Sequence, residues 1–122
     1  MTKDVEYVHS KGLIIGGYTL MQNPPGLSGD DYCKSPDGGS EYNSHIADFT
    51  TEFHRKYRDA IVAFLGETKM DMLETDGPYE GATCAPTNNS GFTHTNNSQV
   101  GQWNATVEFY RTLKAKYLLR TT

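Results

Sequence analysis

The sequence has no basic cluster and no long apolar run. Eleven Lys and Arg stand against fifteen Asp and Glu, which gives a formal net charge of −4. Without a basic stripe, nucleic acid is not an expected partner. The apolar run Ile61–Leu65, which Ala60 extends by one residue, is far shorter than the roughly 20 residues of a membrane-spanning helix. We therefore expect no membrane contact, no transmembrane helix and no signal peptide in this sequence.

Cysteine and histidine are also scarce. The four histidines form no metal-ligating set, and we expect His9 and His54 on the outer surfaces of helices. No Ser-His-Asp or Cys-His pairing is indicated, so we expect no metal and no cofactor. Cys33 and Cys84 lie in two polar stretches and belong to no CxxC pair. Two unpaired small residues are the simplest interpretation; a bridge between the stretches, or thiols lining one site, are the alternatives.

Helical spacing recurs in three segments. Residues 3–11 have the pattern of the last turns of a helix that Gly12 ends. Apolar residues three or four apart predict a second helix from Ser44 to Gly66 and a third that Asn97 or Ser98 caps. The residues expected on the apolar faces of these two helices are Ile46, Phe49, Phe53, Tyr57, Ile61 and Phe64, and Val100, Trp103, Val107, Tyr110, Leu113 and Tyr117.

Two segments have the character of strands. Residues 13–21 form a near-continuous apolar run, which is typical of a parallel strand covered on both faces. Residues 70–76 form a second strand, and residues 118–121 are the candidate for a third. The resulting order, α-β-α-β-α with a final strand as an option, predicts an α/β fold with a parallel sheet and right-handed crossovers.

The connections are unequal in length. Residues 22–43 and 77–97 follow the strands, whereas the connections from helix to strand take only a few residues. Long loops at the carboxyl ends of strands are typical of a (β/α)8 TIM barrel, and both should meet on one face and bring Cys33 near Cys84. A full barrel needs about 250 residues. Residues 1–122 are therefore interpreted as a partial barrel domain of two to three βα units, or alternatively as a small free-standing α/β domain.

The second strand ends in acids. Because side chains two apart share one face of a strand, Met70, Met72, Glu74 and Asp76 should face one way, and Leu73 and Thr75 the other. Carboxylates at the carboxyl end of a barrel strand occupy the place where barrel enzymes carry out catalysis. The structural alternative is a plain turn, in which Asp76 caps backbone amides ahead of Gly77 and Pro78.

Two stretches resemble successive helix–strand steps of the α-galactosidase (melibiase-like) glycoside hydrolases. The first is Tyr-Val-His-Ser-Lys-Gly-Leu-Ile-Ile-Gly-Gly-Tyr-Thr at 7–19, and the second runs from Phe64 to Gly81 through Met-Asp-Met-Leu-Glu-Thr-Asp-Gly-Pro-Tyr. Residues 82–117, with Cys84, His94 and Trp103, are most similar to uncharacterised carbohydrate-active relatives in Bacteroidetes.

The resemblance implies a retaining glycosidase in which Asp76 matches the nucleophile. Glu74 stands where the family usually has a lysine, and this charge reversal leaves galactose specificity open. The family's general acid lies on a later strand, beyond Thr122, so the chain alone is expected to be inactive. Glu74 cannot be that acid, because two strand rises place it roughly 6.5 Å from Asp76 on the same side of a substrate bond.

The remaining candidates are contacts to sugar. Glu74 is a candidate hydroxyl-binding or pKa-tuning neighbour of Asp76. Tyr18 and Tyr79 are placed to stack on sugar rings, although packing at a barrel rim explains them equally well. His94 and Cys84, both in the second long loop, complete the predicted substrate-binding set.

We therefore interpret the chain as a piece of a glycoside hydrolase acting on α-linked, galactoside-like sugars, with an oligosaccharide or glycoside as its substrate. A non-catalytic sugar-binding relative of the barrel and a small α/β interaction domain are the alternatives. Unpaired strand edges predict a homodimer through the sheet edges. The sequence leaves the localisation open, with a periplasmic or secreted parent protein as one option.

Overall fold

The computed structural model describes residues 1–122 except 39–45, 78–80, 118–119 and 122. Helices and strands alternate along the chain, and two short 3₁₀ turns lie in the long loops. In chain order the elements are α1 (Thr2–Ser10), β1 (Gly16–Leu20), η1 (Gly29–Asp31), α2 (Glu52–Thr68), β2 (Met72–Asp76), η2 (Thr95–Asn97), α3 (Ser98–Lys116) and β3 (Arg120–Thr121).

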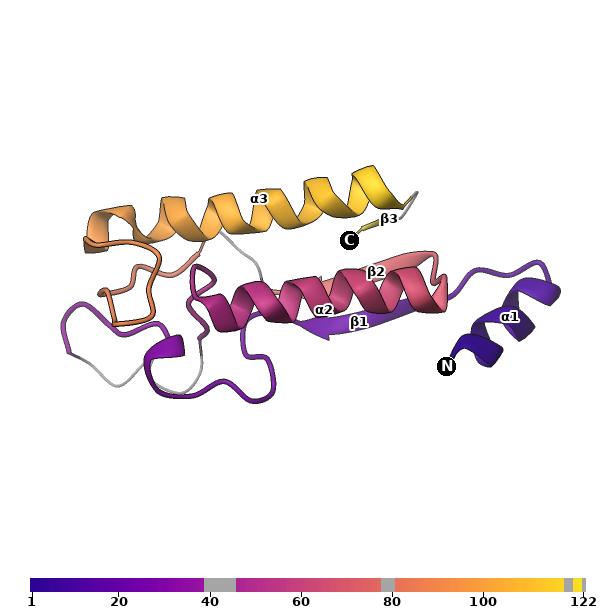
Figure 1. The fold of residues 1–122 in the computed structure, drawn as a ribbon, viewed down its shortest axis with the longest axis horizontal. Coiled ribbons are helices and arrows are strands. Elements are labelled where there is room, and N and C mark those ends of the chain that lie inside the picture. Colours follow the sequence, from indigo (N-terminus) through magenta and orange to yellow (C-terminus); the bar gives the residue numbers. More distant parts are fainter. Residues whose placement is uncertain (39–45, 78–80, 118–119, 122) are drawn as a thin grey trace.

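The three strands form one parallel sheet in the order β1-β2-β3. Helices α2 and α3 run in the same direction beside the sheet, and the long loops gather at the end where these helices begin (Figure 1). The prediction of a parallel α/β arrangement is therefore confirmed. The arrangement is compatible with a segment of a (β/α)8 barrel, whose strands are also parallel and linked through helices.

The connection from α1 to β1 follows the sequence pattern. Lys11 caps α1, and Gly12 adopts a left-handed φ of 72°, which ends the helix as predicted. The Asp71 carboxylate, just before β2, accepts hydrogen bonds from the backbone N–H of Ile15 at 3.0 Å and from His9 Nε2 at 2.8 Å. These two contacts lower the pKa of Asp71, the backbone N–H contributing most. One side chain thus ties α1 to the start of both strands.

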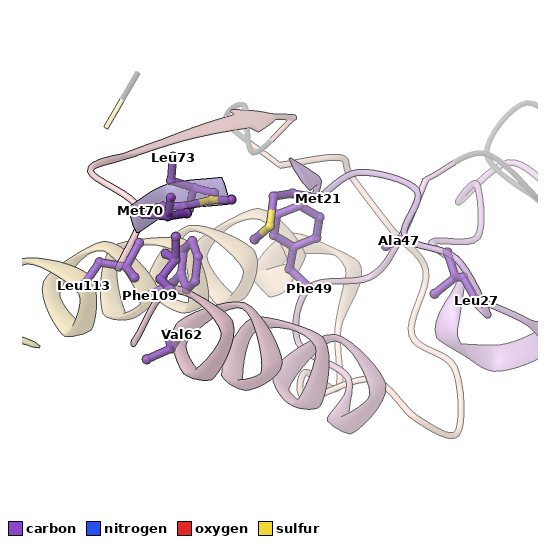
Figure 2. Close-up of a cluster of buried hydrophobic side chains, with 11 residues drawn as sticks. Met21, Leu27, Ala47, Phe49, Val62, Met70, Leu73, Phe109 and Leu113 are labelled. Atoms are coloured by element: carbon purple, nitrogen blue, oxygen red, sulfur yellow. The ribbon is translucent and has the colours of Figure 1, made fainter. Parts of the chain in front are cut away.

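The main core lies between the sheet and the helices. Figure 2 shows Leu73 and Met70 on the sheet side of this cluster and Phe109, Leu113 and Val62 on the helix side. Burial of such side chains is the largest favourable term in the stability of the fold. The buried members of the cluster are Val5, Met21, Leu27, Ala47, Phe49, Val62, Leu65, Met70, Leu73, Phe109 and Leu113.

The prediction for the β-strands was wrong in two respects. Met70 precedes β2 and is buried in the main core, so it does not share the face of Glu74 and Asp76. The segment around β1 is not covered on both faces, because Leu13, Ile14 and Tyr18 are largely exposed.

The predicted start of α2 at Ser44 was also wrong. Ser44 lies outside the described residues, and α2 begins at Glu52 because the preceding residues form other contacts. Ala47 pairs with Tyr32 in an isolated antiparallel bridge, and Thr51 Oγ1 accepts a hydrogen bond from the backbone N–H of His54. A threonine in this role is a common helix N-cap, and it defines the start of α2.

Gly66 does not end α2. The helix continues to Thr68 and stops at Lys69, which adopts a left-handed φ of 62°. Gly66 has a packing role instead, since a Cβ at this position would contact the hydroxyl of Tyr117. That hydroxyl donates a hydrogen bond to the backbone oxygen of Val62 at 3.0 Å. The absent side chain makes room for the end of α3 to dock on α2.

The inward face of α3 differs from the predicted apolar face. Trp103 and Val100 are 54% and 61% exposed. The buried positions are Ser98, Gln102, Thr106, Phe109 and Leu113. Ser98 and Gln102 are buried although polar, because their side chains form hydrogen bonds with the loop backbone at Cys84 and Ala82. No helix among the described residues has the length and apolar character needed to cross a membrane.

Candidate functional site

One face of the sheet carries the predicted acids. The register pairs Tyr18 with Glu74 and Leu20 with Asp76, so these four side chains lie on the same face. On the opposite face, Leu73 is buried in the main core. The prediction that Glu74 and Asp76 lie opposite Leu73 is therefore confirmed.

Two pairs of hydroxyl groups connect the other face of the sheet to the helices. Thr19 Oγ1 lies 2.7 Å from the hydroxyl of Tyr57 on α2, and Thr75 Oγ1 lies 2.6 Å from the hydroxyl of Tyr110 on α3. Each strand is thus bonded through a side chain to one helix. This arrangement leaves Tyr18, 59% exposed, and Glu74, also exposed, on the open face.

The central contact of the open face joins the two strands. The Tyr18 hydroxyl donates a hydrogen bond to Asp76 Oδ2 at 2.6 Å. Hydrogen bonds to an ionised carboxylate are short and strong, and they orient the carboxylate. Asp76 is half-buried at the carboxyl end of β2. One of its oxygens is thereby held in place by a side chain from the neighbouring strand.

A tight turn places the end of β2 against β1. The backbone oxygen of Asp76 accepts hydrogen bonds from the N–H groups of Met21 at 2.9 Å and Gln22 at 3.2 Å. Gly77 follows with a φ of 58°, and a Cβ there would lie 2.6 Å from Gln22 Oε1. Only glycine meets both requirements without strain. The next residue of interest, Tyr79, lies outside the described residues.

The two long loops meet, as predicted from the parallel strands. Cys33 and Cys84 form a disulfide with a Cα–Cα distance of 5.2 Å across a sequence separation of 51 residues. The interpretation as unpaired loop residues was therefore wrong, and the alternative of a bridge is correct. Both cysteines are fully buried, and Phe92 completes a small second core with them. Lys34 and Ala85, next to the bridge, form an antiparallel pair.

Polar contacts reinforce the joined loops. Asp30 accepts from Lys34 Nζ at 2.9 Å and from Asn88 Nδ2 at 3.1 Å, while Asp31 accepts from Asn89 Nδ2 at 3.0 Å. The hydrogen bond and charge of Lys34 hold the pKa of Asp30 below its usual value. These loops are long, but they have internal bonding of their own, as is usual for ordered loops of this length.

Asp48 is a buried carboxylate that the sequence patterns did not indicate. Its Oδ1 accepts from the backbone N–H and the hydroxyl of Thr50, at 2.9 and 2.6 Å, and its Oδ2 accepts from the Ser90 hydroxyl at 2.7 Å. Three donors satisfy this fully buried group, as a buried charge requires. Asp48 thereby connects the entry to α2 with the second long loop.

His54 was wrongly predicted to lie on the surface. It is fully buried, stacks on Phe49 with ring centroids 3.9 Å apart, and its Nε2 lies 2.9 Å from the Met21 backbone oxygen. Since Nε2 donates to that oxygen, Nδ1 accepts from Arg58 Nη1 at 2.5 Å. Burial lowers the pKa of His54 to about 4, so the ring is neutral at pH 7. His54 therefore supports the end of β1 structurally.

The loop candidates lie differently. His94 is exposed just before η2, and none of the contacts of the described residues joins it to Glu74 or Asp76. Cys84 is buried in the disulfide and its backbone N–H donates to Ser98 Oγ at 3.0 Å. This leaves Cys84 no exposed surface with which to contact a sugar. The described residues also contain no group of three His, Cys, Asp or Glu side chains positioned to hold a metal ion.

Comparison with known proteins gives a structural relative. No family profile and no curated protein sequence matches the chain. The fold is similar to that of a GH36 α-galactosidase, AgaA from Geobacillus stearothermophilus, solved in complex with stachyose, with a TM-score of 0.63 and 11% sequence identity. The match covers 96% of this chain and 18% of that enzyme, so the chain spans less than a fifth of its relative. The comparison supports a distant structural resemblance to a glycoside hydrolase.

Proposed function

We propose that the chain is a segment of a glycoside hydrolase in which Asp76 is the carboxylate nucleophile. The observation that carries the proposal is the hydrogen bond from Tyr18 to Asp76 Oδ2, at the carboxyl end of two parallel strands. In parallel α/β folds this end of the sheet is where substrates bind. The structural relative bound to stachyose adds support at the level of the fold.

The geometry suits a nucleophile better than an acid. A carboxylate that attacks an anomeric carbon must be ionised and held in one orientation. Tyr18 donates a hydrogen bond to Asp76 Oδ2 and so helps to hold the carboxylate in one orientation for attack. Attack forms a bond from a carboxylate oxygen of Asp76 to the anomeric carbon, while the bond to the leaving oxygen breaks and a general acid protonates the leaving oxygen.

Glu74 has a different role in this proposal. It projects from the same strand and the same face as Asp76, so the two cannot stand on opposite sides of a scissile bond. Its exposed carboxylate accepts hydrogen bonds from sugar hydroxyls. The aromatic ring of Tyr18, largely exposed beside it, offers a face on which a sugar ring stacks.

A non-catalytic sugar-binding protein is the second candidate. One observation favours it: the neighbouring carboxylate, Glu74, projects from the same face of the same strand as Asp76 and so cannot serve as the general acid. Both candidates predict that sugar binds at Tyr18, Glu74 and Asp76. They differ in catalysis, because only the first predicts that glycosides are hydrolysed once additional protein sequence supplies the general acid.

Titration by nuclear magnetic resonance tests the shared prediction. Methyl α-galactoside and stachyose should shift the backbone amides of Tyr18, Glu74 and Asp76 saturably, and Asp76→Asn should weaken binding about tenfold or more. Asp4→Asn on α1 is the matched control, because Asp4 is an exposed carboxylate outside the sheet. Shifts that are absent, or that survive Asp76→Asn unchanged, would overturn the proposed site.

A further inference from the structure

A buried arginine lies on the helix-covered side of the molecule. Arg58 on α2 is only 9% exposed. Its Nη1 donates to the backbone oxygen of Phe49 at 2.8 Å and to Nδ1 of His54. The contacts of the described residues include no hydrogen bond from its Nη2 or Nε. Two of the three guanidinium nitrogens, Nη2 and Nε, therefore donate no hydrogen bond to the described residues.

The charge of Arg58 also lacks a direct counter-ion. None of the carboxylates among the described residues comes within 4.0 Å of its guanidinium. Burial lowers the pKa of Arg58, and the charges of Asp59 and Glu108 oppose this only from a distance. A buried cation without a paired anion is unfavourable, and a bound anion would relieve that cost.

Arg58 lines a hollow between α2 and α3. Two solvent-open surface hollows of about 240 and 460 Å³ share Arg55, Arg58, Ala105 and Glu108 in their walls. The larger cavity extends to Thr51 and Glu52 at the first turn of α2 and to Asn104 on α3. A hollow of this size holds a molecule as large as a monosaccharide.

The start of α2 adds further donors. In this 17-residue helix the N–H of His54 is capped by Thr51 Oγ1, and the N–H of Arg55 bonds to the Thr51 backbone oxygen. The N–H groups of Glu52 and Phe53 precede these and have no acceptor within the helix. Helix N-termini of this kind favour negatively charged ligands.

We propose that this hollow binds a small carboxylate carrying a single negative charge, with Arg58 as its principal partner. A guanidinium fork matches the two oxygens of a carboxylate. The acidic side chains that line the hollow limit how much negative charge a bound ligand can carry. Arg55 is already paired with Asp59 at 2.9 Å and Glu52 at 3.5 Å, and Glu108 remains exposed nearby. These acids disfavour a dianion such as phosphate, whereas water screens the exposed Glu108 enough to admit a monoanion.

The test compares two sugars that differ only at one carbon. D-Galacturonate and D-galactose are titrated at constant ionic strength and pH 7, followed through the Arg58 Nε–Hε resonance and the amides of Glu52 and Phe53. Galacturonate should shift these signals saturably, and galactose should not. Phosphate at pH 8 should bind at least about threefold more weakly than galacturonate, because it meets Glu108 and Glu52 with two charges. Shifts on β1 and β2 instead would report the candidate sugar site, so the two proposals fail separately.

Variants locate the binding. Glu108→Gln removes one opposing charge and should tighten galacturonate binding about threefold, with an unchanged fold. Arg111→Gln, the matched control, removes an exposed arginine of α3 that does not line the hollow and should change binding less than about twofold. Arg58→Lys keeps the charge but loses the fork, and should weaken binding about tenfold. If Arg58→Lys fails to fold by circular dichroism, Glu108→Gln decides the question. The proposal is overturned by a lack of saturable shifts up to about 50 mM, by equal shifts with galactose, by tighter binding of phosphate, or by an unchanged affinity in Glu108→Gln.

Discussion

Tyr18 and Asp76 meet across two neighbouring parallel strands, with the tyrosine hydroxyl 2.6 Å from the carboxylate oxygen Oδ2. The two residues are not directly paired in the sheet, since Tyr18 is level with Glu74 and Asp76 is level with Leu20. The long tyrosine side chain therefore leans toward the carboxyl end of the sheet to reach the carboxylate. This diagonal contact connects the proposed nucleophile to the strand before it.

Removing that hydroxyl should affect the ligand more than the fold. Tyr18→Phe loses one exposed hydrogen bond, so we expect the free energy of unfolding to fall by no more than about 1 kcal/mol. Binding of methyl α-galactoside should weaken about three- to tenfold because Asp76 loses its orientation. Denaturation and titration measure the two effects. Tyr7→Phe on α1, an exposed tyrosine outside the sheet, serves as the control. Equal affinities for Tyr18→Phe and the unaltered chain would contradict the role given to the contact.

The isolated chain should not hydrolyse glycosides at an enzymatic rate. Proton delivery by a general acid typically contributes about 10²- to 10⁴-fold, and Glu74 is on the wrong side to provide it. An aryl α-galactoside, whose leaving group needs little protonation, is the most sensitive substrate for the assay. Robust turnover by the purified 122-residue chain, abolished by Asp76→Asn, would show that the chain contains a complete active site.

Stability should fall in mild acid because of His54. Burial keeps its folded-state pKa at about 4, whereas an unfolded histidine titrates near 6.5. Above pH 6.5 the ring of His54 is neutral in both the folded and the unfolded chain. Between pH 6.5 and pH 4 the ring binds a proton only in the unfolded chain, so the free energy of unfolding falls as the pH falls. The slope should approach about 1.4 kcal/mol per pH unit, for a total of roughly 3 kcal/mol.

His54→Gln tests the assignment. The glutamine amide can still donate to Met21 and accept from Arg58, but it does not titrate. Urea denaturation at pH 7 and pH 4.5 should show this component of the acid-induced loss to be missing in His54→Gln. His94→Gln, which alters an exposed histidine, should retain it. A loss of the same size in both variants would assign the pH dependence to other groups.

The disulfide should make a large contribution to stability. A bridge across 51 residues lowers the entropy of the unfolded chain by an amount worth about 4 kcal/mol in the simple chain model. Paired replacement of Cys33 and Cys84 by alanine should therefore lower the free energy of unfolding by about 2–4 kcal/mol, measured by urea denaturation. A reducing agent should destabilise the unaltered chain and leave the alanine variant unaffected. Identical midpoints for both proteins with and without reductant would contradict the prediction.

Association through the sheet edge remains a prediction. Within the described sheet, β1 pairs only with β2, so it is an edge strand, the kind of strand at which sheets of two chains join. Leu13, Ile14 and Leu20 near this edge are also exposed. We expect a dimer or larger assembly in light scattering during size exclusion, and Leu20→Lys should shift it toward monomer. A cooperative monomer at tens of micromolar would argue against the prediction.

Local patterns in the sequence were sufficient to predict part of this structure. The opposite faces of Leu73 and Asp76 follow from the alternation of a strand, and the end of α1 at Gly12 follows from helix-capping chemistry. The parallel sheet followed from the alternation of helices and strands. In each case, the determining interaction lies within a few residues or within a simple order of elements.

The errors come from contacts between residues distant in sequence. The bridge of Ala47 to Tyr32 delays the start of α2, and nothing near Ala47 reveals it. The inward face of α3 was misjudged because Gln102 Nε2 donates to the Ala82 backbone oxygen at 2.7 Å. That polar contact buries a glutamine and leaves the larger Trp103 outside. The pairing of Cys33 with Cys84 likewise depends on the meeting of two loops.

The joined loops also affect how this fold can be re-engineered. Loops on barrel-like scaffolds are usually treated as separate modules, each exchanged between its own strand and helix. Here the first loop supplies Cys33 and Asp30, and the second supplies Cys84 and Asn88, so each loop depends on the other for its covalent and polar partners. A graft of one loop alone would leave one cysteine without its disulfide partner and would remove part of the small core around Phe92. The unit that can be transplanted is the pair, and insertions in one loop will be tolerated only where they leave the contacts to the other intact.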